Sequence, residues 1–574
     1  MNKKQWILLI VGLLGLLALF AACKAPEAVR TAEEGGGGGT PVVLPTKTPL
    51  PADVKAVPGG FYRSSYSNDP PYWDANMGTS GETSGLLNRI HMELFQFHYG
   101  PQYEYWDLDI DTEHGLVTTW EVSKDALTWT FRLRQGVLWQ NKPPMNGREF
   151  VANDVKWTLE TQMTTAGAPR RTVLSEAIAS MECPDKYTLV LHLKEPRADM
   201  LMILANPYIP ILAPELKTVT GDLNTQKAVV GLGAFTLDDW VPNVRTVYKK
   251  NPTYYRANEG LPYMDGLYHV MITDPSTSLA AFRAEKLDSR GISRLDLASV
   301  KETNPDIYCH EGEVGLTQAA MAFRSDKPPF NDPRVRAAVS MALNDQEIID
   351  TLYYGYGIVQ NGPIHANSPW YLKDQGECDK YNQYNPEEAR KLLAEAGYPN
   401  GFETTLNYTA SWGATWSEYV EYWAESLEKI GIKATIKSSE LGAHYVNRLC
   451  GYDGMVFTYD WGGATFGPYS WLDGVYLPKG GSHFGCVDDP KMTALIKAEM
   501  VEMDPVKRQV ILDDLQRYAA CQQYYVQWPM AWGVSCQQPW VMNYQGHIVA
   551  YHTGRVAEQI WLRDDAPGRG AAYY

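Results

Sequence analysis

The sequence lacks the short motifs that mark several common catalytic and nucleotide-binding sites. It contains no Gly-x-Ser-x-Gly elbow, no His-Glu-x-x-His pair and no glycine-rich phosphate loop. Its 11 histidines are scattered, with no pair at metal-binding spacing on one helix.

Asp107, Asp109 and Asp111 resemble the start of a calcium loop. That loop requires glycine at its sixth position and glutamate at its twelfth, where this chain has Thr112 and Thr118. We therefore predict no metal and no cofactor, and we interpret the stretch as a solvated acidic turn.

Basic residues are scarce relative to acidic ones. The 574 residues include 51 Lys and Arg against 67 Asp and Glu, a net charge of −16, so no basic face for nucleic acid is expected. A hydrophobic fraction of 45% and a charged fraction of 21% are typical of a globular protein. The length predicts three or four domains or lobes.

Aromatic residues are abundant, with 18 Trp, 36 Tyr and 14 Phe. We assign most of them to the core, although such rings also suit wet binding surfaces.

Long apolar runs are absent except for one at the N-terminus. Lys3 and Lys4 precede an apolar run over residues 6–22, which ends in two alanines followed by Cys23. A positive start, an apolar middle and small residues at the end predict a secretory signal over residues 1–22. A cysteine directly after two alanines resembles the lipobox of bacterial lipoproteins, which implies that Cys23 is lipidated. An uncleaved anchor helix is the alternative.

The segment after this signal is rich in glycine and proline. Residues 23–58 include five consecutive glycines, Gly35 to Gly39, and then five prolines. Glycine tracts are flexible and proline tracts are extended, so we interpret 23–58 as a linker. We expect the folded body to be exported and to be held by its lipid at the cell membrane, facing the periplasm or the cell exterior.

The eight cysteines show no Cys-x-x-Cys pair and no zinc-like spacing. With Cys23 lipidated, seven remain, so at least one is free if the others pair. One or two disulfides are compatible with an exported protein. The candidates that lie near each other in sequence are Cys450–Cys486 and Cys521–Cys536, and buried thiols are the alternative.

The first half of the body contains patterns of both strand and helix. Residues 128–134 alternate strictly between apolar and polar, which predicts a half-buried strand. Residues 187–193 are rich in strand-forming residues and predict another. Between them, Asn153 is expected to cap a helix.

The second half of the body alternates between helix and strand. Asp332 and Asn385 are each followed by proline, which predicts two helix starts. Gly397 and Gly431 are placed to end helices, and residues 432–437 alternate as a strand. Helix-strand-helix-strand order predicts an α/β layer architecture. No repeat of fixed period is present.

Five short blocks follow one another in a characteristic order. They are Trp129–Arg134 with Asn146-Gly147 and Ala152–Val155, Gly231–Phe235 with Asn251–Tyr255, Pro329–Arg336, Tyr384–Pro386 with Leu392–Pro399, and Leu427–Ile432. Together they resemble the extracellular solute-binding proteins of the peptide, opine and nickel class, family 5, which serve ABC importers. Extra residues, roughly 142–145, lengthen one loop relative to the family pattern.

The resemblance implies an α/β fold of two lobes, like that of periplasmic binding proteins, with an additional subdomain in the first lobe. Lobe I is expected to contain residues 60–98, 226–313 and 535–574. The subdomain is expected at 99–225 and lobe II at 314–534. The implied function is capture of a solute in the cleft between the lobes, hinge closure, and delivery to an ABC permease in the membrane. We expect a monomer and no enzymatic activity.

The nature of the solute depends on the segment after one strand of lobe II. In peptide binders of this family, an Asp in this segment pairs with the amino group of the peptide. By that pattern the Asp should stand near position 464, where this chain has Ala464, and the nearest acid is Asp460. Losing such a charge-assisted bond should weaken peptide binding. Tyr459 and Trp461, followed by the flexible Gly463, would instead suit stacking on sugar rings.

Four other rings are candidates for the cleft, namely Trp412, Trp416, Trp528 and Trp532. For each of them, packing in the core is the alternative. Three functions therefore stay open at this point: a binder of oligopeptides or similar solutes, a binder of oligosaccharides, and a secreted glycoside-active enzyme. The last would need two carboxylates facing one cleft, about 5–10 Å apart.

Overall fold

The computed structural model describes residues 55–77, 81–100, 103, 108–166, 168, 170–313, 318–460, 467–478, 482–545 and 553–569. All of the described residues belong to one compact unit. The predicted signal segment, Cys23 and most of the linker lie outside the described part of the chain.

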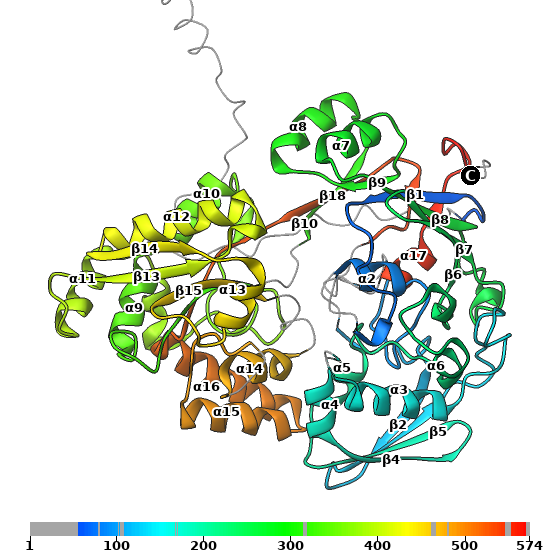
Figure 1. The fold of residues 1–574 in the computed structure, drawn as a ribbon, viewed down its shortest axis with the longest axis horizontal. Helices are drawn as coiled ribbons and strands as arrows, with labels where there is room; N and C mark the ends of the chain where they lie inside the picture. Colours follow the sequence, from blue (N-terminus) through cyan, green and yellow to red (C-terminus); the bar gives the residue numbers. More distant parts are fainter. Residues whose placement is uncertain are drawn as a thin grey trace, which may run out of the picture. The chain divides into compact units, whose positions relative to one another are not determined.

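One sheet has four strands in the order β1-β8-β7-β6. β1 (Phe61–Tyr66) and β8 (Gly266–Met271) are parallel. β7 (Arg245–Lys250) is antiparallel to β8 and forms a hairpin with β6 (Phe235–Val241). We call the body built on this sheet lobe I (Figure 1). Because β1 precedes its neighbour β8 by a long stretch of chain, this sheet is assembled from distant segments.

A second sheet, also of four strands, has the order β2-β3-β5-β4. Its strands are β2 (Val117–Val122), β3 (Thr128–Leu133), β5 (Thr188–Leu193) and β4 (Ile178–Asp185), and all neighbours are antiparallel. The two strands predicted in this part of the chain are confirmed as β3 and β5. We call this body the subdomain. Its apolar core is continuous with that of lobe I, so the two share one hydrophobic cluster.

Helix α3 (Ala152–Thr164) of the subdomain begins earlier than predicted. Its cap residue is Val151, and the expected cap Asn153 lies inside the first turn. The side chain of Asp154 accepts the Val151 N–H at 3.1 Å and also pairs with Arg148 at 2.7 Å. Asp154 therefore orders this helix start in place of Asn153.

Lobe II is built on a five-stranded sheet in the order β14-β13-β15-β11-β16. Its strands are β14 (Ile432–Ser438), β13 (Phe402–Tyr408), β15 (Met455–Asp460), β11 (Gln318–Phe323) and β16 (Tyr525–Gln527). β13 is parallel to both β14 and β15, whereas β11 is antiparallel to β15 and β16. The strand predicted at the position of β14 and the α/β class are confirmed.

The predicted helix starts of lobe II are confirmed in detail. α9 (Pro333–Met341) and α11 (Pro386–Glu395) each have proline in the first turn, and the side chains of Asp332 and Asn385 accept a backbone N–H there. α12 (Ala414–Glu428) carries the predicted helical run of aromatic and apolar residues, and its buried side chains face the lobe II core. The caps fix where these helices begin, and the apolar faces fix how they pack.

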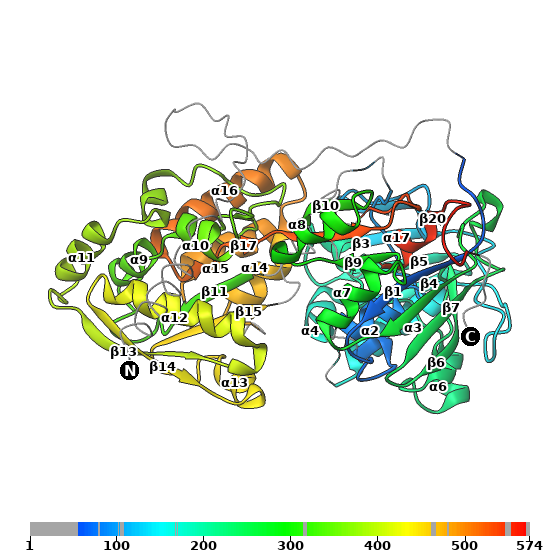
Figure 2. The ribbon, with the colours of Figure 1, turned by 90° about the horizontal axis from the view of Figure 1, so that it is seen from above.

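Further helices and short strand pairs complete the described chain (Figures 1 and 2). In lobe II these are α10 (Asp345–Leu352), α13 (Leu441–Asn447), α14 (Pro468–Tyr476), α15 (Pro490–Val501), α16 (Pro505–Gln522), and the pair β12 (Gly357–Ile358) with β17 (Met530–Ala531). Lobe I and the subdomain carry α2 (Gly81–Leu87), α4 (Arg171–Ala177), α5 (Met200–Leu204), α6 (Pro214–Thr220), α7 (Pro275–Arg283), α8 (Arg294–Thr303), α17 (Thr553–Gln559), and the pair β19 (Val541–Met542) with β20 (Trp561–Leu562).

Two antiparallel strands carry the chain between the lobes. β10 (Tyr308–Glu313) precedes lobe II, and β18 (Gly533–Gln537) returns from it to pair with β9 (Ser289–Gly291) in the order β10-β18-β9. The paired strands are visible in Figure 1. Cys309 and Cys536 lie opposite each other in this ladder and form a disulfide. The two crossover strands are therefore covalently joined.

The described residues form three disulfides, Cys309–Cys536, Cys378–Cys521 and Cys450–Cys486. The predicted pair Cys450–Cys486 is confirmed. The predicted pair Cys521–Cys536 is wrong, because Cys521 lies on α16 beside Cys378 and Cys536 lies on β18. Buried thiols are likewise ruled out for these six residues. Cys183 is the free cysteine of the described chain.

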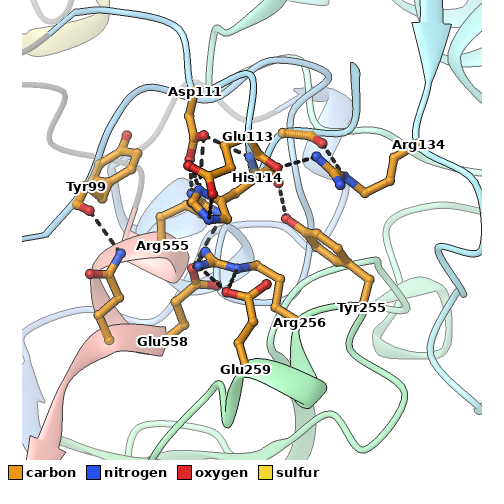
Figure 3. A network of polar contacts seen from close by, with 12 residues as sticks. Tyr99, Asp111, Glu113, His114, Arg134, Tyr255, Arg256, Glu259, Arg555 and Glu558 are labelled. Carbon is orange, nitrogen blue, oxygen red and sulfur yellow. Dashed lines mark hydrogen bonds and ion pairs between the residues drawn. The ribbon is translucent and has the colours of Figure 1, made fainter. Parts of the chain in front are cut away.

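Buried ion pairs attach helix α17 to lobe I (Figure 3). Arg555 contacts Asp111 at 2.7 Å and Glu558 at 3.3 Å, and Glu558 also contacts Arg256 at 2.7 Å. Asp111 is 4% exposed, so the interpretation of its stretch as a solvated turn is wrong for this residue. Burial opposes ionisation of Asp111, but Arg555 and His114 outweigh it and hold the pKa below its usual range. The pattern of three acids gave no indication of a cationic partner so distant in sequence.

Candidate functional site

Three parallel strands of lobe II end at one edge of its sheet. Because β13 is parallel to β14 and to β15, the carboxyl ends of all three meet there. In α/β sheets, ligands bind in the crevice outside the carboxyl ends of the strands. The segments that follow these three strands therefore form the candidate wall of a binding site.

Two predicted tryptophans lie in the segment that follows β13. Trp412 is in the short helical turn 410–412, and Trp416 is in the first turn of α12. Their ring centroids are 5.6 Å apart, and both side chains are half-buried. Trp416 also packs at the margin of the lobe II core, whereas Trp412 contacts the ring of His444 at 4.9 Å. The structure thus brings both of them to the candidate wall.

The segment after β14 contributes an arginine beside buried polar groups. Glu440 caps α13, and the guanidinium of Arg448, one residue beyond that helix, lies over the rings of Tyr445 and Phe484 at 4.3 and 4.6 Å. Arg448 Nη1 donates to Thr458 Oγ1 of β15 at 3.2 Å. The arginine therefore extends from α13 to the end of the neighbouring strand. Its planar cation suits a carboxylate or an aromatic group.

His444 is fully buried behind this arginine. Burial, together with the nearby charge of Arg448, lowers the pKa of His444 to about 4. The imidazole is therefore neutral near pH 7, and the tyrosine hydroxyl of Tyr452 lies 3.3 Å from its Nδ1. We assign His444 to the support of Trp412 and of α13.

The third segment follows β15. Tyr459 and Asp460 are the last residues of this strand, opposite Ala319 and Gln318 of β11. Their side chains, and Trp461, Gly463 and Ala464 entirely, lie outside the described part of the chain.

The structure describes the chain again from Gly467. A Cβ atom added to Gly467 would contact the side chain of Met202, on α5 of the subdomain, at 3.8 Å. Gly467 of lobe II therefore lies close to the subdomain.

The remaining two predicted tryptophans lie elsewhere. Trp528 is 1% exposed in the lobe II core, where its Nε1 donates to the hydroxyl of Tyr353 at 2.8 Å. We therefore correct its assignment from the cleft to the core. Trp532 is half-buried just before the crossover strand β18, and its N–H donates to Tyr356 O at 3.1 Å. The structure does not bring it to the edge formed by β13, β14 and β15.

Arg448 is the residue of this wall that the sequence did not single out. A single arginine is common on any helix, and its neighbours Phe484 and Thr458 are distant in sequence. Only the order β14-β13-β15 of the sheet brings the segment after β14 to Thr458, near the end of β15.

Two further observations concern the described residues as a whole. Among the described residues, no group of three or more His, Cys, Asp or Glu side chains is placed to hold a metal ion. In the same residues, no helix is both long and apolar enough to cross a membrane.

Two α/β lobes joined by paired crossover strands define the class of periplasmic-binding-protein-like folds. The sequence matches the model of the bacterial extracellular solute-binding proteins, family 5, over residues 111–483. This match covers more than half of the chain, and the protein belongs to that family.

Individual relatives support the same fold. The glutathione-binding protein GsiB of Salmonella paratyphi A is 29% identical over 344 residues, which cover 58% of this chain and 63% of that relative. A structure of the periplasmic binding protein DppA from Helicobacter pylori with peptide STSA has a TM-score of 0.72 at 24% identity, covering 88% of this chain and 98% of its own. The binding protein AgaA of A. tumefaciens R10, with agropinic acid, has a TM-score of 0.70 at 23% identity, covering 88% and 99%.

Proposed function

We propose that the protein is the solute-binding component of an ABC importer. It captures a solute between its lobes, closes over it, and delivers it to a membrane permease. The observation that carries this proposal is the family match over residues 111–483, in a chain whose lobes are joined by β10 and β18. A solute that contacts both lobes favours the closed state of such a hinge. The cycle needs no covalent chemistry, and a glycoside-active enzyme is not proposed for a member of a solute-binding family.

The proposed division of the chain follows the same logic. Lobe I comprises residues 60–98, 226–313 and 535–574, the subdomain 99–225, and lobe II 314–534. The buried contact of Glu558 on α17 with Arg256 supports the assignment of the C-terminal segment to lobe I.

The proposed wall of lobe II is the edge where β13, β14 and β15 end. Its described members are Trp412, Trp416 and Arg448, and we place Tyr459, Asp460, Trp461 and Gly463 there as well. The contact of Gly467 with Met202 supports a position for this segment between lobe II and the subdomain.

We propose an oligopeptide or a similar charged solute. Arg448 offers a guanidinium to a carboxylate, and Asp460 is the nearest acid for an amino group. The relative GsiB is named for glutathione, and the DppA structure holds a peptide. An oligosaccharide is the second candidate, favoured by the paired half-buried rings of Trp412 and Trp416.

The proposal is tested by thermal unfolding of the exported chain with panels of di- to hexapeptides and of oligosaccharides. A true solute at 100 times its dissociation constant should stabilise the folded state by about 2.7 kcal/mol. We expect peptides to raise the melting temperature and sugars to leave it unchanged. The reverse result would replace the peptide with an oligosaccharide, and no shift with either panel would contradict both candidates.

The matched variants are Trp461→Ala and Trp157→Ala. Trp157 is half-buried on α3, away from the proposed wall, and serves as the control. Trp461→Ala should weaken the solute-induced shift while lowering unliganded stability by no more than about 1 kcal/mol, whereas a core Trp loses about 3–5 kcal/mol. A loss of the larger size would make Trp461 a packing residue.

We further propose that the exported protein is a monomer, anchored to the cell membrane by a lipid on Cys23. The linker 23–58 then keeps the body near the permease and raises its effective concentration there. Cys23→Ser should move the protein from the membrane fraction to the soluble fraction of the expressing cells. Retention in the membrane fraction would favour an uncleaved anchor helix.

A further inference from the structure

The first lobe and lobe II meet at a second place, away from the crossover strands. The turn between β5 and α5 lies against the end of α15, where Ala198 N donates to Met500 O at 2.8 Å. Gly467 lies near Met202 in the same region, since a Cβ added to it would be 3.8 Å from that side chain. The subdomain therefore contacts lobe II here through a backbone hydrogen bond.

Four charged side chains gather at this contact. Arg197 Nε donates to Asp199 Oδ1 at 3.3 Å on the subdomain side, and Arg508 of α16 pairs with Glu499 of α15 at 2.5 Å on the other. The side chains of Arg197, Asp199 and Glu499 are at most 1% exposed, and that of Arg508 is 12% exposed. Burying a charged side chain costs free energy unless the charge is fully paired.

The pairing of the two acids is incomplete. Arg508 approaches one oxygen of Glu499, Oε1, through both Nε and Nη2. The other oxygen, Oε2, is buried without a hydrogen-bond partner within the described chain, and so is Oδ2 of Asp199. An ionised carboxylate only accepts hydrogen bonds, whereas a protonated one also donates. A proton on Oε2 would remove the charge that is expensive to bury and would supply a donor.

We propose that this contact is a latch between the lobes, and that Glu499 takes up a proton when the latch closes. This inference rests on the proposed function in one respect only, because solute capture is what gives closure a role. The subdomain turn is hydrogen-bonded to Met500, the residue next to Glu499, and its Arg197 and Asp199 both act electrostatically on this carboxyl. Separation of the lobes therefore returns Glu499 towards water.

The direction of the pH effect follows from the closed and open environments. In this structure, where the subdomain turn lies against α15, burial raises the pKa of Glu499 from 4.5 to about 7 against the opposing charge of Arg508, and the charge of Asp199 adds to the rise. We take this arrangement as the closed latch. In the open form the pKa returns towards 4.5. The closed form binds more protons, so acid favours closure. The effect is complete below the pKa of Glu499 in the open form, and it is lost as the pH rises through the pKa of Glu499 in the closed form.

Among the described residues, the charged groups that act on Glu499 are Arg508, Arg197 and Asp199. Arg508 faces it from α16, and Arg197 and Asp199 face it from the subdomain turn. Helix α14, which also packs against α15, carries Asp473 as its single acidic or basic residue. The proton uptake is therefore assigned to Glu499 within this set.

Small-angle X-ray scattering of the solute-free exported chain at pH 5.5 and pH 8 tests the latch. We expect a smaller radius of gyration at pH 5.5, because the equilibrium constant for closure rises on the order of tenfold between the two pH values. Glu499→Gln should be closed at both pH values, since the amide carries no charge and has a donor. Glu502→Gln, three residues further along and less buried, is the matched control and should behave like the unchanged protein.

A radius of gyration that does not depend on pH, or one that keeps its pH dependence in Glu499→Gln, would overturn the latch. If Glu499→Gln does not fold, Asp199→Asn provides the second test. Removing that neighbouring charge should move the midpoint of the transition to lower pH, and an unchanged midpoint would contradict the proposal. Because no solute is present, failure of the latch leaves the proposed solute capture standing, and a failed peptide panel leaves the latch standing.

Discussion

Trp528 lies in the middle of the lobe II core, surrounded by other aromatic rings. Its centroid is 4.7 Å from that of Tyr419, 5.9 Å from Phe457 and 6.1 Å from Trp423. Its Nε1 is satisfied by the hydroxyl of Tyr353. A buried Trp with its polar atom paired contributes mainly through packing and apolar burial. Trp412, by contrast, keeps a half-exposed ring at the end of a strand.

We predict that Trp528→Ala lowers the free energy of unfolding by about 3–5 kcal/mol, the range for a truncated core Trp. The loss combines a large cavity with the loss of the hydrogen bond from Trp528 Nε1 to the Tyr353 hydroxyl, which keeps its bond to Pro529 O. Trp532→Ala is the comparison, because this ring is half-buried beside the crossover strand, and it should cost only about 1 kcal/mol. Chemical denaturation of both variants measures the difference. Equal losses would mean that Trp528 is not the packing residue described here.

The predicted tryptophans show how much of the candidate site could be predicted from the sequence. Aromatic type and position near predicted strands led to the prediction of Trp412 and Trp416, which the structure places in the segment after β13. They could not separate these rings from Trp528, because exposure depends on which helix covers which face. Arg448 was missed for the converse reason, since its aromatic and strand neighbours come from different segments.

At the scale of single elements, prediction succeeded where the cause is local. Asp332 and Asn385 cap helices because a short polar side chain accepts an N–H of the next turn, and the following proline fits the first position. Gly397 and Gly431 end helices with φ of +96° and +88°, a region that favours glycine. Each of these signals lies within a few residues of its effect.

Prediction failed for elements whose partners are distant. Asn153 was expected to cap α3, but the buried pair of Asp154 with Arg148 sets the start of the helix instead. Cys521 was paired with its sequence neighbour Cys536, whereas strand β18 pairs with β10 and places Cys536 opposite Cys309. Ladder register decides such contacts, and register across a whole lobe cannot be derived from local patterns.

At the scale of the whole molecule, the two-lobed fold depends on the order in which the chain passes through its elements. The chain visits lobe I, the subdomain, lobe I again, lobe II, and finally returns along β18. Composition and periodicity indicate α/β layers but not such a discontinuous path. The five family-like blocks in order were the signal that predicted two lobes, and they said little about the solute, because most of their residues cap helices or turn the chain.

The crossover disulfide belongs to this largest scale, because it encloses lobe II. Cys309 and Cys536 are separated by 227 residues, whereas Cys450 and Cys486 are separated by 36. Restricting the unfolded chain should be worth about 5 kcal/mol for the long loop and about 4 kcal/mol for the short one. We therefore predict that replacing both cysteines of the crossover pair by serine lowers the free energy of unfolding more than replacing both of the short pair.

Denaturant unfolding of the two double variants, with Cys183→Ser as the control, measures this order. Cys183 is a free thiol, so its replacement should leave the stability almost unchanged. The crossover variant should also unfold lobe II and the first lobe less cooperatively, because β10 and β18 are then joined only by their hydrogen bonds. A larger loss from the short pair would show that contacts around Cys450 in the folded state outweigh the restriction of the unfolded chain.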